Sequence, residues 1–164
     1  MDASTVTAVA ATAIASASFA VSISEARTTR RHNRHSVAPL LEIWTQRRQG
    51  GTTGLRLCNY GLGPAVVTST SVALDGVELG GWIRPVIDGL RGSLAEWPRA
   101  LAVNPGHHVI PAGAERFLMH VPDYDPVRHG DLWQLLTTRL TLRVTYDSLY
   151  GGEGFEVRHP LPYT

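Results

Sequence analysis

The stretch "RLTLRVTYDS", residues 139–148, alternates apolar and polar side chains along its whole length. Apolar side chains occupy every second position: Leu140, Leu142, Val144 and Tyr146. The positions between them are polar: Thr141, Arg143 and Thr145. Successive side chains of a β-strand point to opposite faces of its sheet, so this period of two predicts a strand with one buried and one solvated face.

The same period recurs throughout residues 37–164, in runs bounded by Gly, Pro, Asn and Asp. These runs are "PLLEIWTQ" (39–46), "GLRLCNYG" (54–61), "AVVTSTSVALDG" (65–76), "ERFLMHV" (115–121) and "FEVRH" (155–159). In "ERFLMHV" we expect Phe117, Met119 and Val121 to face the core. Six or more short strands separated by such turn residues favour a mainly β fold, an antiparallel immunoglobulin-like β-sandwich. Two helical insertions are expected, in "PVIDGLRGSLAEW" (85–97) and "GDLWQLLT" (130–137).

Turn residues separate these strands. Asp75 and Gly76 form a turn pair at the end of the third predicted strand. In "NYGLGPA" we expect a turn of the hairpin type, in which Asn59, Gly61 and Gly63 supply unusual backbone angles ahead of Pro64. A phosphate-binding loop would need a third glycine and a following helix, whereas proline and a β-branched strand follow here.

Residues 5–24, "TVTAVAATAIASASFAVSIS", contain no charged residue, no proline and no glycine. The run has about the twenty residues that a membrane-spanning helix requires, so we expect a single transmembrane helix over residues 1–24. Two alternatives stay open. A cleaved signal peptide could end near "ASA" (15–17), although no basic residue precedes the run, and a soluble amphipathic helix would need a charged face. Small residues at four-residue spacing would allow a homodimer: Ala8, Thr12, Ser16 and Ala20.

Four arginines follow the uncharged run, in a basic juxtamembrane segment at residues 25–36: Arg27, Arg30, Arg31 and Arg34. Basic residues close to a span stay on the cytoplasmic side of the membrane. The expected protein is therefore single-pass, with its C-terminal domain (37–164) in the cytoplasm. At the membrane interface each arginine would gain about 1 kcal/mol from anionic lipid.

The composition of the 164-residue chain limits the classes of function. The net charge is +1, so there is no global basic field for nucleic acid, and none is expected as a partner. Cys58 is the single cysteine, which excludes an internal disulfide framework. No zinc spacing, Walker loop or nucleophile elbow occurs, and we expect neither a metal nor a cofactor.

Two pairs of residues are candidates for a metal-binding or catalytic site. Asp123 and Asp125 lie two residues apart in "PDYDP", but the other ligands of a calcium loop are missing and a polar turn is the simpler interpretation. His107 and His108 are adjacent, so in a strand they would point to opposite faces and could not easily hold one metal ion together. A hydrolase using Asp123, Asp125 and His129 is the least favoured of three hypotheses.

Two further stretches, "HNRHSVAPLLEI" (32–43) and "LCNYGLGPAVVTSTSVALDG" (57–76), carry recognisable motifs. They resemble a family of uncharacterised bacterial proteins with an N-terminal span, a His-Asn-Arg-x-Ser-Val-x-Pro motif and an Asn-x-Gly-x-Gly-Pro-Ala turn. The matching residues are His32, Asn33, Arg34, Ser36, Val37, Pro39, Asn59, Gly61, Gly63, Pro64, Ala65, Asp75 and Gly76. His35 stands where an apolar residue is more usual. The resemblance implies an anchored architecture and no catalytic residue.

These observations favour a membrane-anchored β-sandwich that acts as a non-enzymatic interaction module. Its partners would be the lipid bilayer, through the N-terminal helix, and an unknown protein. The alternative is an exported or periplasmic sandwich that binds a ligand after cleavage of a signal peptide.

Overall fold

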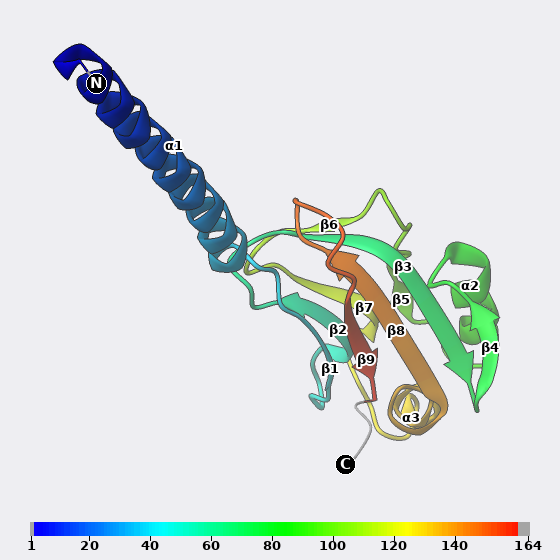
Figure 1. Ribbon diagram of the computed structural model, residues 1–164. Helices are drawn as coiled ribbons and strands as arrows, with labels where there is room; N and C mark the ends of the chain where they lie inside the picture. The colour runs from blue at the N-terminus through cyan, green and yellow to red at the C-terminus, as the bar shows by residue number, and fades with distance from the viewer. Residues whose placement is uncertain (1, 161–164) are drawn as a thin grey trace. The chain divides into compact units, whose positions relative to one another are not determined.

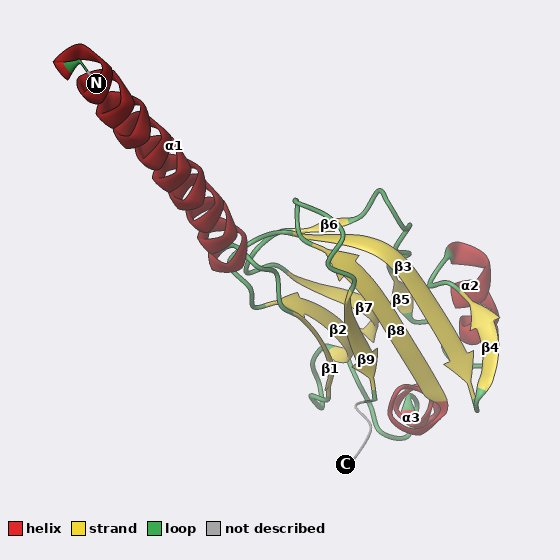
Figure 2. Ribbon diagram, viewed as in Figure 1, coloured by secondary structure: helices red, strands yellow, loops and turns green. Residues whose placement is uncertain are grey.

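The computed structural model describes residues 2–160, except for the side chains of residues 5–10 and 29–36 (Figure 1). The chain divides into two compact units, Met1–Ser36 and Val37–Thr164. The first unit is a helix, and the second contains every strand (Figure 2).

Helix α1 runs without a break from Ala3 to Ser36 and so continues through the expected boundary at residue 24. Its hydroxyl side chains donate to the carbonyl oxygen four residues earlier, as in Ser16 to Thr12 at 2.8 Å and Ser22 to Ser18 at 2.9 Å. Such bonds satisfy polar side chains within the helix itself.

The transmembrane helix expected over residues 1–24 is not confirmed. Within the part of the chain that the structure describes, no helix is both long enough and apolar enough to cross a membrane. The expected span includes Met1 and the side chains of residues 5–10, which lie outside the described residues.

The second unit consists of two antiparallel sheets, which confirms the predicted mainly β fold. The first sheet has the order β1 (Leu41–Gln46), β2 (Thr53–Asn59), β7 (Glu115–Val121), β5 (Arg99–Ala100). The second has the order β4 (Val77–Gly80), β3 (Ala65–Leu74), β8 (Leu140–Asp147), β9 (Phe155–His159), and β6 (Val109–Ile110) also pairs with β3.

One core holds the two sheets together, since a single cluster of buried apolar side chains draws on both. Strand β8 lies between β3 and β9 and has the predicted alternation. The apolar set of β8 is at most 3% exposed, while Thr141 and Arg143 are solvent-exposed. The strand predicted from residues 139–148 and its inward face are therefore confirmed.

Strand β7 departs from the predicted alternation. Phe117 is half-buried and lies beneath the guanidinium of Arg56, whereas Leu118 and Met119 are both buried. The register between β2 and β7 shifts between Leu55 and Arg56. A β-bulge places an extra residue in one strand, so two consecutive residues can face the core. The expectation that Phe117 points inward is wrong.

The two predicted turns differ in kind. Asp75 and Gly76 both have positive φ, 50° and 83°, and join β3 to β4 as a two-residue hairpin turn. Residues 60–64 instead connect strands of different sheets, so the expected hairpin there is wrong. Gly61 and Gly63 have ordinary backbone angles. A Cβ on either would overlap the backbone of residues 37–40, and this close approach is why glycine is required.

Both expected helical insertions are present. Helix α2 (Arg84–Gly92) buries Ile87 and Leu90. Helix α3 (Gly130–Gln134) continues into a π-helical turn, Leu135–Arg139, and these two segments bury Leu132, Leu135 and Leu136.

Candidate binding groove between two edge strands

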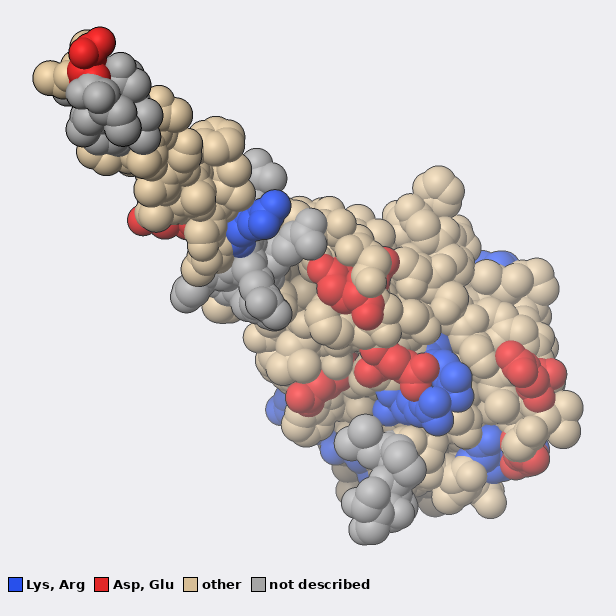
Figure 3. All heavy atoms as spheres, in the orientation of Figure 1, with Lys and Arg blue, Asp and Glu red and all other residues tan. Residues whose placement is uncertain are grey.

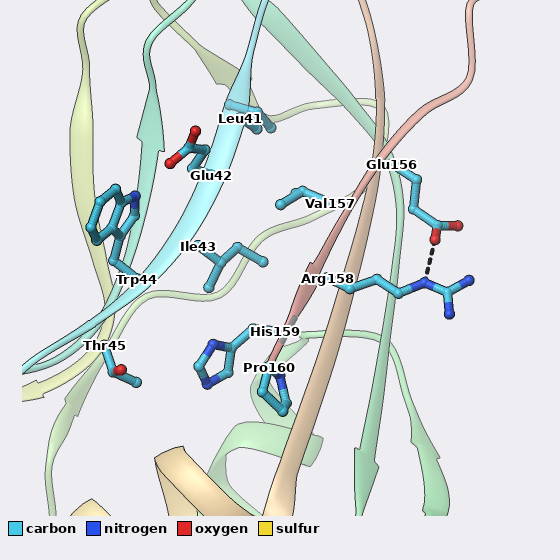
Figure 4. Close-up of a pocket in the computed structure, with 10 residues that line it drawn as sticks. All are labelled: Leu41, Glu42, Ile43, Trp44, Thr45, Glu156, Val157, Arg158, His159 and Pro160. Atoms are coloured by element: carbon cyan, nitrogen blue, oxygen red, sulfur yellow. Dashed lines mark hydrogen bonds and ion pairs between the residues drawn. The ribbon is translucent and has the colours of Figure 1, made fainter. Parts of the chain in front are cut away.

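A groove with a volume of about 690 Å³ lies between β1 and β9, lined by residues 41–45 and 156–160 (Figure 4). Among the described strands, β1 pairs with β2 alone and β9 with β8 alone, so each is the edge of its sheet. The two strands run in the same direction. Leu41, at the start of β1, bonds to Tyr146, and Tyr146 pairs with Phe155, at the start of β9.

The floor of the groove is apolar. Leu41 and Ile43 point from β1 toward Val157 of β9, as Figure 4 shows. Leu41 and Ile43 are buried and Val157 is half-buried. The neighbouring residues alternate away from the floor, with Trp44 on the outer side of β1 and Arg158 on the far side of β9 (Figure 4). The groove is therefore an opening onto the core between two sheet edges.

The backbone of β1 presents polar groups toward this opening. Leu40 accepts a bond from the Tyr60 N–H at 2.8 Å, whereas the Leu41 N–H donates to the Tyr146 hydroxyl at 3.1 Å. In an antiparallel pair the residues alternate between facing the partner strand and facing away from it. The N–H and C=O groups of Ile43 and Thr45 accordingly point away from β2.

Charged side chains of β9 lie on the side of the strand away from the floor, where they pair with one another (Figure 4). The Arg158 guanidinium lies against the Glu156 carboxylate, and Arg143 Nη1 lies 3.6 Å from Glu156 Oε2. These groups are partly solvent-exposed, so the pairs contribute little to stability. The charged residues that line the groove are Glu42, Glu156 and Arg158, and because Glu156 and Arg158 pair with each other the rim carries little net charge around an apolar floor.

His159 closes one end of the groove. Its ring is buried, and Nε2 donates to the carbonyl oxygen of Leu136, in the π-helical turn, at 2.7 Å. Burial lowers the pKa of His159, and the bond to Leu136 opposes this in part. The neutral ring is the form that the folded protein prefers.

We expect the stability of the protein to fall as the pH drops below about 6.5, the ordinary pKa of histidine. A histidine with a lowered pKa in the folded state binds protons more readily when unfolded. The stability that such a neutral histidine contributes is complete above its pKa in the unfolded state. This stability is lost as the pH falls toward its pKa in the folded state. His120, whose pKa is lowered by burial and by the charge of Arg99, acts in the same direction.

Urea unfolding between about pH 7 and pH 5 measures this effect, since carboxylates titrate mainly below that window. His159→Gln keeps a donor for Leu136 and does not titrate, so the variant should lose less stability over the window. Adding His120→Gln should flatten the profile further. If His159→Gln keeps the full wild-type pH dependence, the burial argument is wrong.

Asn59 fixes the other end of the groove, where β1 begins. Its side chain is fully buried and makes four hydrogen bonds. Oδ1 accepts from the N–H groups of Leu40 (3.1 Å) and Gly61 (3.0 Å). Nδ2 donates to the carbonyl oxygens of Gly63 (2.9 Å) and Ile110 (3.0 Å). The Asn59 amide therefore links three parts of the unit: the start of β1, the connection between the two sheets, and strand β6.

Asn59→Ala should lower the free energy of unfolding by roughly 2–4 kcal/mol, because it leaves two donors and two acceptors without their partner. Chemical denaturation monitored by circular dichroism measures the change. Asn104→Ala is the matched control, since Asn104 is exposed and its loss should cost about 0.5 kcal/mol or less. Similar losses for both variants would contradict the role assigned to Asn59.

Two of the three residues of the hydrolase hypothesis, Asp125 and His129, are engaged in local structure, while Asp123 is exposed. His129 is buried. Its Nδ1 accepts the Asp125 N–H at 2.9 Å, so Nε2 carries the proton and donates to Glu96 at 2.8 Å. The Asp125 carboxylate accepts the N–H groups of Arg128 and Val127, which lower its pKa. Both ring nitrogens of His129 are therefore occupied, and these contacts give the hypothesis no support.

The other predicted site residues lie in separate places. Arg27 is exposed on α1, while the side chains of Arg30, Arg31 and Arg34 lie outside the described residues. Pro64 directly precedes β3, and Arg139 binds the Asp75 carboxylate at 2.6 Å. Cys58 is buried. Among the described residues, no three His, Cys, Asp or Glu side chains are placed to hold a metal ion.

Sequence reasoning identified both strands of the groove but missed the groove itself. The alternation of "LEIW" and "FEVRH" was available as a signal, yet it does not reveal which strands become sheet edges. Edge position depends on long-range pairing.

Comparison of the chain with models of protein families, with curated proteins and with solved structures finds no significant match. The resemblance to a bacterial family therefore stays a prediction.

Proposed function

We propose that the protein is a membrane-anchored, non-enzymatic interaction module that binds an extended segment of a partner protein in the groove between β1 and β9. The observation that carries this proposal is the groove: two edge strands of different sheets run side by side over an apolar floor.

An extended peptide suits this geometry better than a compact ligand. The backbone groups of Ile43 and Thr45 face the opening, and an added strand could pair with them. Side chains at alternate positions of that strand would reach the floor formed by Leu41, Ile43 and Val157. The expected partner segment therefore has apolar residues at every second position, with no strong net charge because the rim is nearly balanced.

An immunoglobulin-like β-sandwich fits the architecture of residues 37–164. Two antiparallel sheets share one core, and the chain passes between the sheets at residues 60–64. Such sandwiches commonly bind partners through their edges and loops.

The membrane anchor rests on the sequence of the N-terminal unit. Residues 5–24 are free of charge and belong to one continuous helix, whose hydroxyls bond within the helix. The arginines of residues 25–36 would hold the β unit on the cytoplasmic side. Small residues along the run would permit a homodimer, in which two copies present two grooves.

A paired substitution at Thr45 tests the groove. Full-length protein in detergent micelles is used to select binders from a displayed library of random seven-residue peptides. The tightest peptide then serves as a fluorescent probe for anisotropy titrations. Thr45→Pro removes the outward N–H without touching the pairing with β2, and proline is tolerated at such edge positions. Thr45→Ala keeps the N–H and is the matched control.

We expect selected peptides to alternate apolar residues, Thr45→Pro to weaken probe binding at least tenfold, and Thr45→Ala to bind almost as wild type. Thermal melts of both variants check the fold. Equal binding by folded Thr45→Pro and Thr45→Ala would contradict strand addition at β1.

A further inference from the structure

One end of the β unit carries few charged residues, and the carboxylates of Asp147 and Glu153 at that end are both hydrogen-bonded within the loop that follows β8. At that end residues 37–40 lead into β1, and residues 60–64, 104–114 (which include β6) and 148–154 lie between strands. The pairing places them there together: Leu41 lies opposite Asn59, Ala65 opposite Ile110, and Val66 opposite Asp147. Glu153 is the one Asp, Glu, Lys or Arg in these four segments.

The charge of Glu153 is bound within its own loop. Its carboxylate accepts the Ser148 hydroxyl at 2.6 Å and the Ser148 N–H at 3.0 Å, which lowers its pKa. The opposite end of the unit differs sharply, with Arg47, Arg48 and Asp75 in its turns and a charged segment at residues 122–139. In Figure 3, most of the red and blue groups lie over the lower part of the β unit, and the mostly tan upper part also shows a red group.

Large apolar side chains are exposed at this end of the β unit. Leu62 is 79% exposed and Leu149 is 68% exposed. About half of the surface of Leu40, Tyr60 and Val109 is also exposed. We call these five residues the apolar tip. Exposed apolar residues that cluster on one surface commonly mark a contact with a partner or a membrane.

The tip is built on fixed backbone. The Leu62 N–H donates to the Ala38 carbonyl at 3.2 Å, and Gly61 and Gly63 pack directly on residues 37–40. Asn59 bonds both segments from beneath. The exposed side chains are therefore presented by a supported surface, next to the residues through which the chain enters the unit.

We propose that the apolar tip inserts into the interfacial zone of the bilayer that holds the N-terminal helix. This inference rests on the proposed membrane anchor. The chain from Ser24 to Val37 belongs almost entirely to helix α1 and spans about 20 Å at 1.5 Å per residue, so it keeps the unit near the bilayer surface. Leucine and tyrosine side chains on a surface whose few charges are hydrogen-bonded within a loop suit the headgroup boundary, which they enter by about 5–10 Å.

Fluorescence quenching by lipids tests the proposal on the full-length chain. Cys58→Ala removes the buried native thiol, and Leu62→Cys carries an environment-sensitive dye. Val127→Cys is the matched control, because Val127 is 93% exposed and lies at the opposite end of the unit. Both proteins are reconstituted in vesicles of phosphatidylcholine with a minor share of phosphatidylglycerol. Lipids spin-labelled just below the headgroup are the quencher.

We expect vesicle-bound protein to lose most of its dye fluorescence at position 62 and little at position 127. Leu149→Glu should restore much of the fluorescence at position 62, because a charge would pull the tip out of the interface. If the protein floats with the vesicles but the dye is quenched equally at both positions, the proposed insertion of the apolar tip is wrong and the membrane anchor is supported. If the protein does not float with the vesicles, both the membrane anchor and the insertion of the tip are wrong. If the dye at position 62 is already shielded from water in the absence of lipid, and the particles have twice the mass of one chain, a second copy of the protein covers the tip instead.

Discussion

Replacing Leu142 by alanine should lower the free energy of unfolding by roughly 2–5 kcal/mol. Leu142 lies in the central strand β8, is 0% exposed, and pairs with Val72 on one side and His159 on the other. Truncating such a side chain removes apolar burial and leaves a cavity that the surrounding core fills only in part. Equilibrium denaturation in urea measures the change.

Thr141→Ala is the control, because Thr141 neighbours Leu142 in the same strand and points to solvent. Its substitution should change the free energy of unfolding by no more than about 1 kcal/mol. Comparable losses for the two variants would mean that the buried face of β8, and with it the shared core of the two sheets, has been assigned incorrectly.

Reversing the charge balance around the N-terminal run should move the β unit to the other side of the membrane. A fusion of alkaline phosphatase to Thr164 reports the location, since the enzyme is active only outside the cytoplasm. The wild-type fusion should be inactive. A variant with glutamine at the four arginines of residues 25–36 and with two or three lysines added after Met1 should be active, because orientation follows basic residues near the span.

A fluorescent protein at the same position, which matures in the cytoplasm, provides the reciprocal control. Replacing Arg47 and Arg48 by glutamine should leave the orientation unchanged, since they lie beyond the first strand. A membrane-bound wild-type fusion with full phosphatase activity would place the β unit outside, and the arginine segment would then serve another purpose.

The strands could be predicted because their alternation is local. Residues 139–148 show which side chains face the core without any knowledge of their partners, and the pair Asp75-Gly76 matches the positive φ angles of a hairpin turn. Helix α3 and the following turn could likewise be anticipated from Leu132, Leu135 and Leu136, which share one buried face.

What the sequence did not reveal depends on contacts between distant residues. Leu118 is buried because the bulge opposite Arg56 shifts the register of β7, and no local pattern marks that shift. Gly61 and Gly63 are required by the approach of residues 37–40 rather than by their own backbone angles. The groove arises because β1 and β9 end up as neighbouring sheet edges although more than 100 residues separate them in the sequence.

The most direct test of a membrane-anchored module is one fractionation of cells that express the full-length chain. Membranes are washed with alkaline carbonate and floated through a density gradient, and the mass of the protein that floats is determined. We predict that the chain floats with the membranes and retains its N-terminus at residue 1 or 2. Protein released by the carbonate wash, or a mature chain that starts near residue 18, would contradict the anchor and favour a soluble or exported protein.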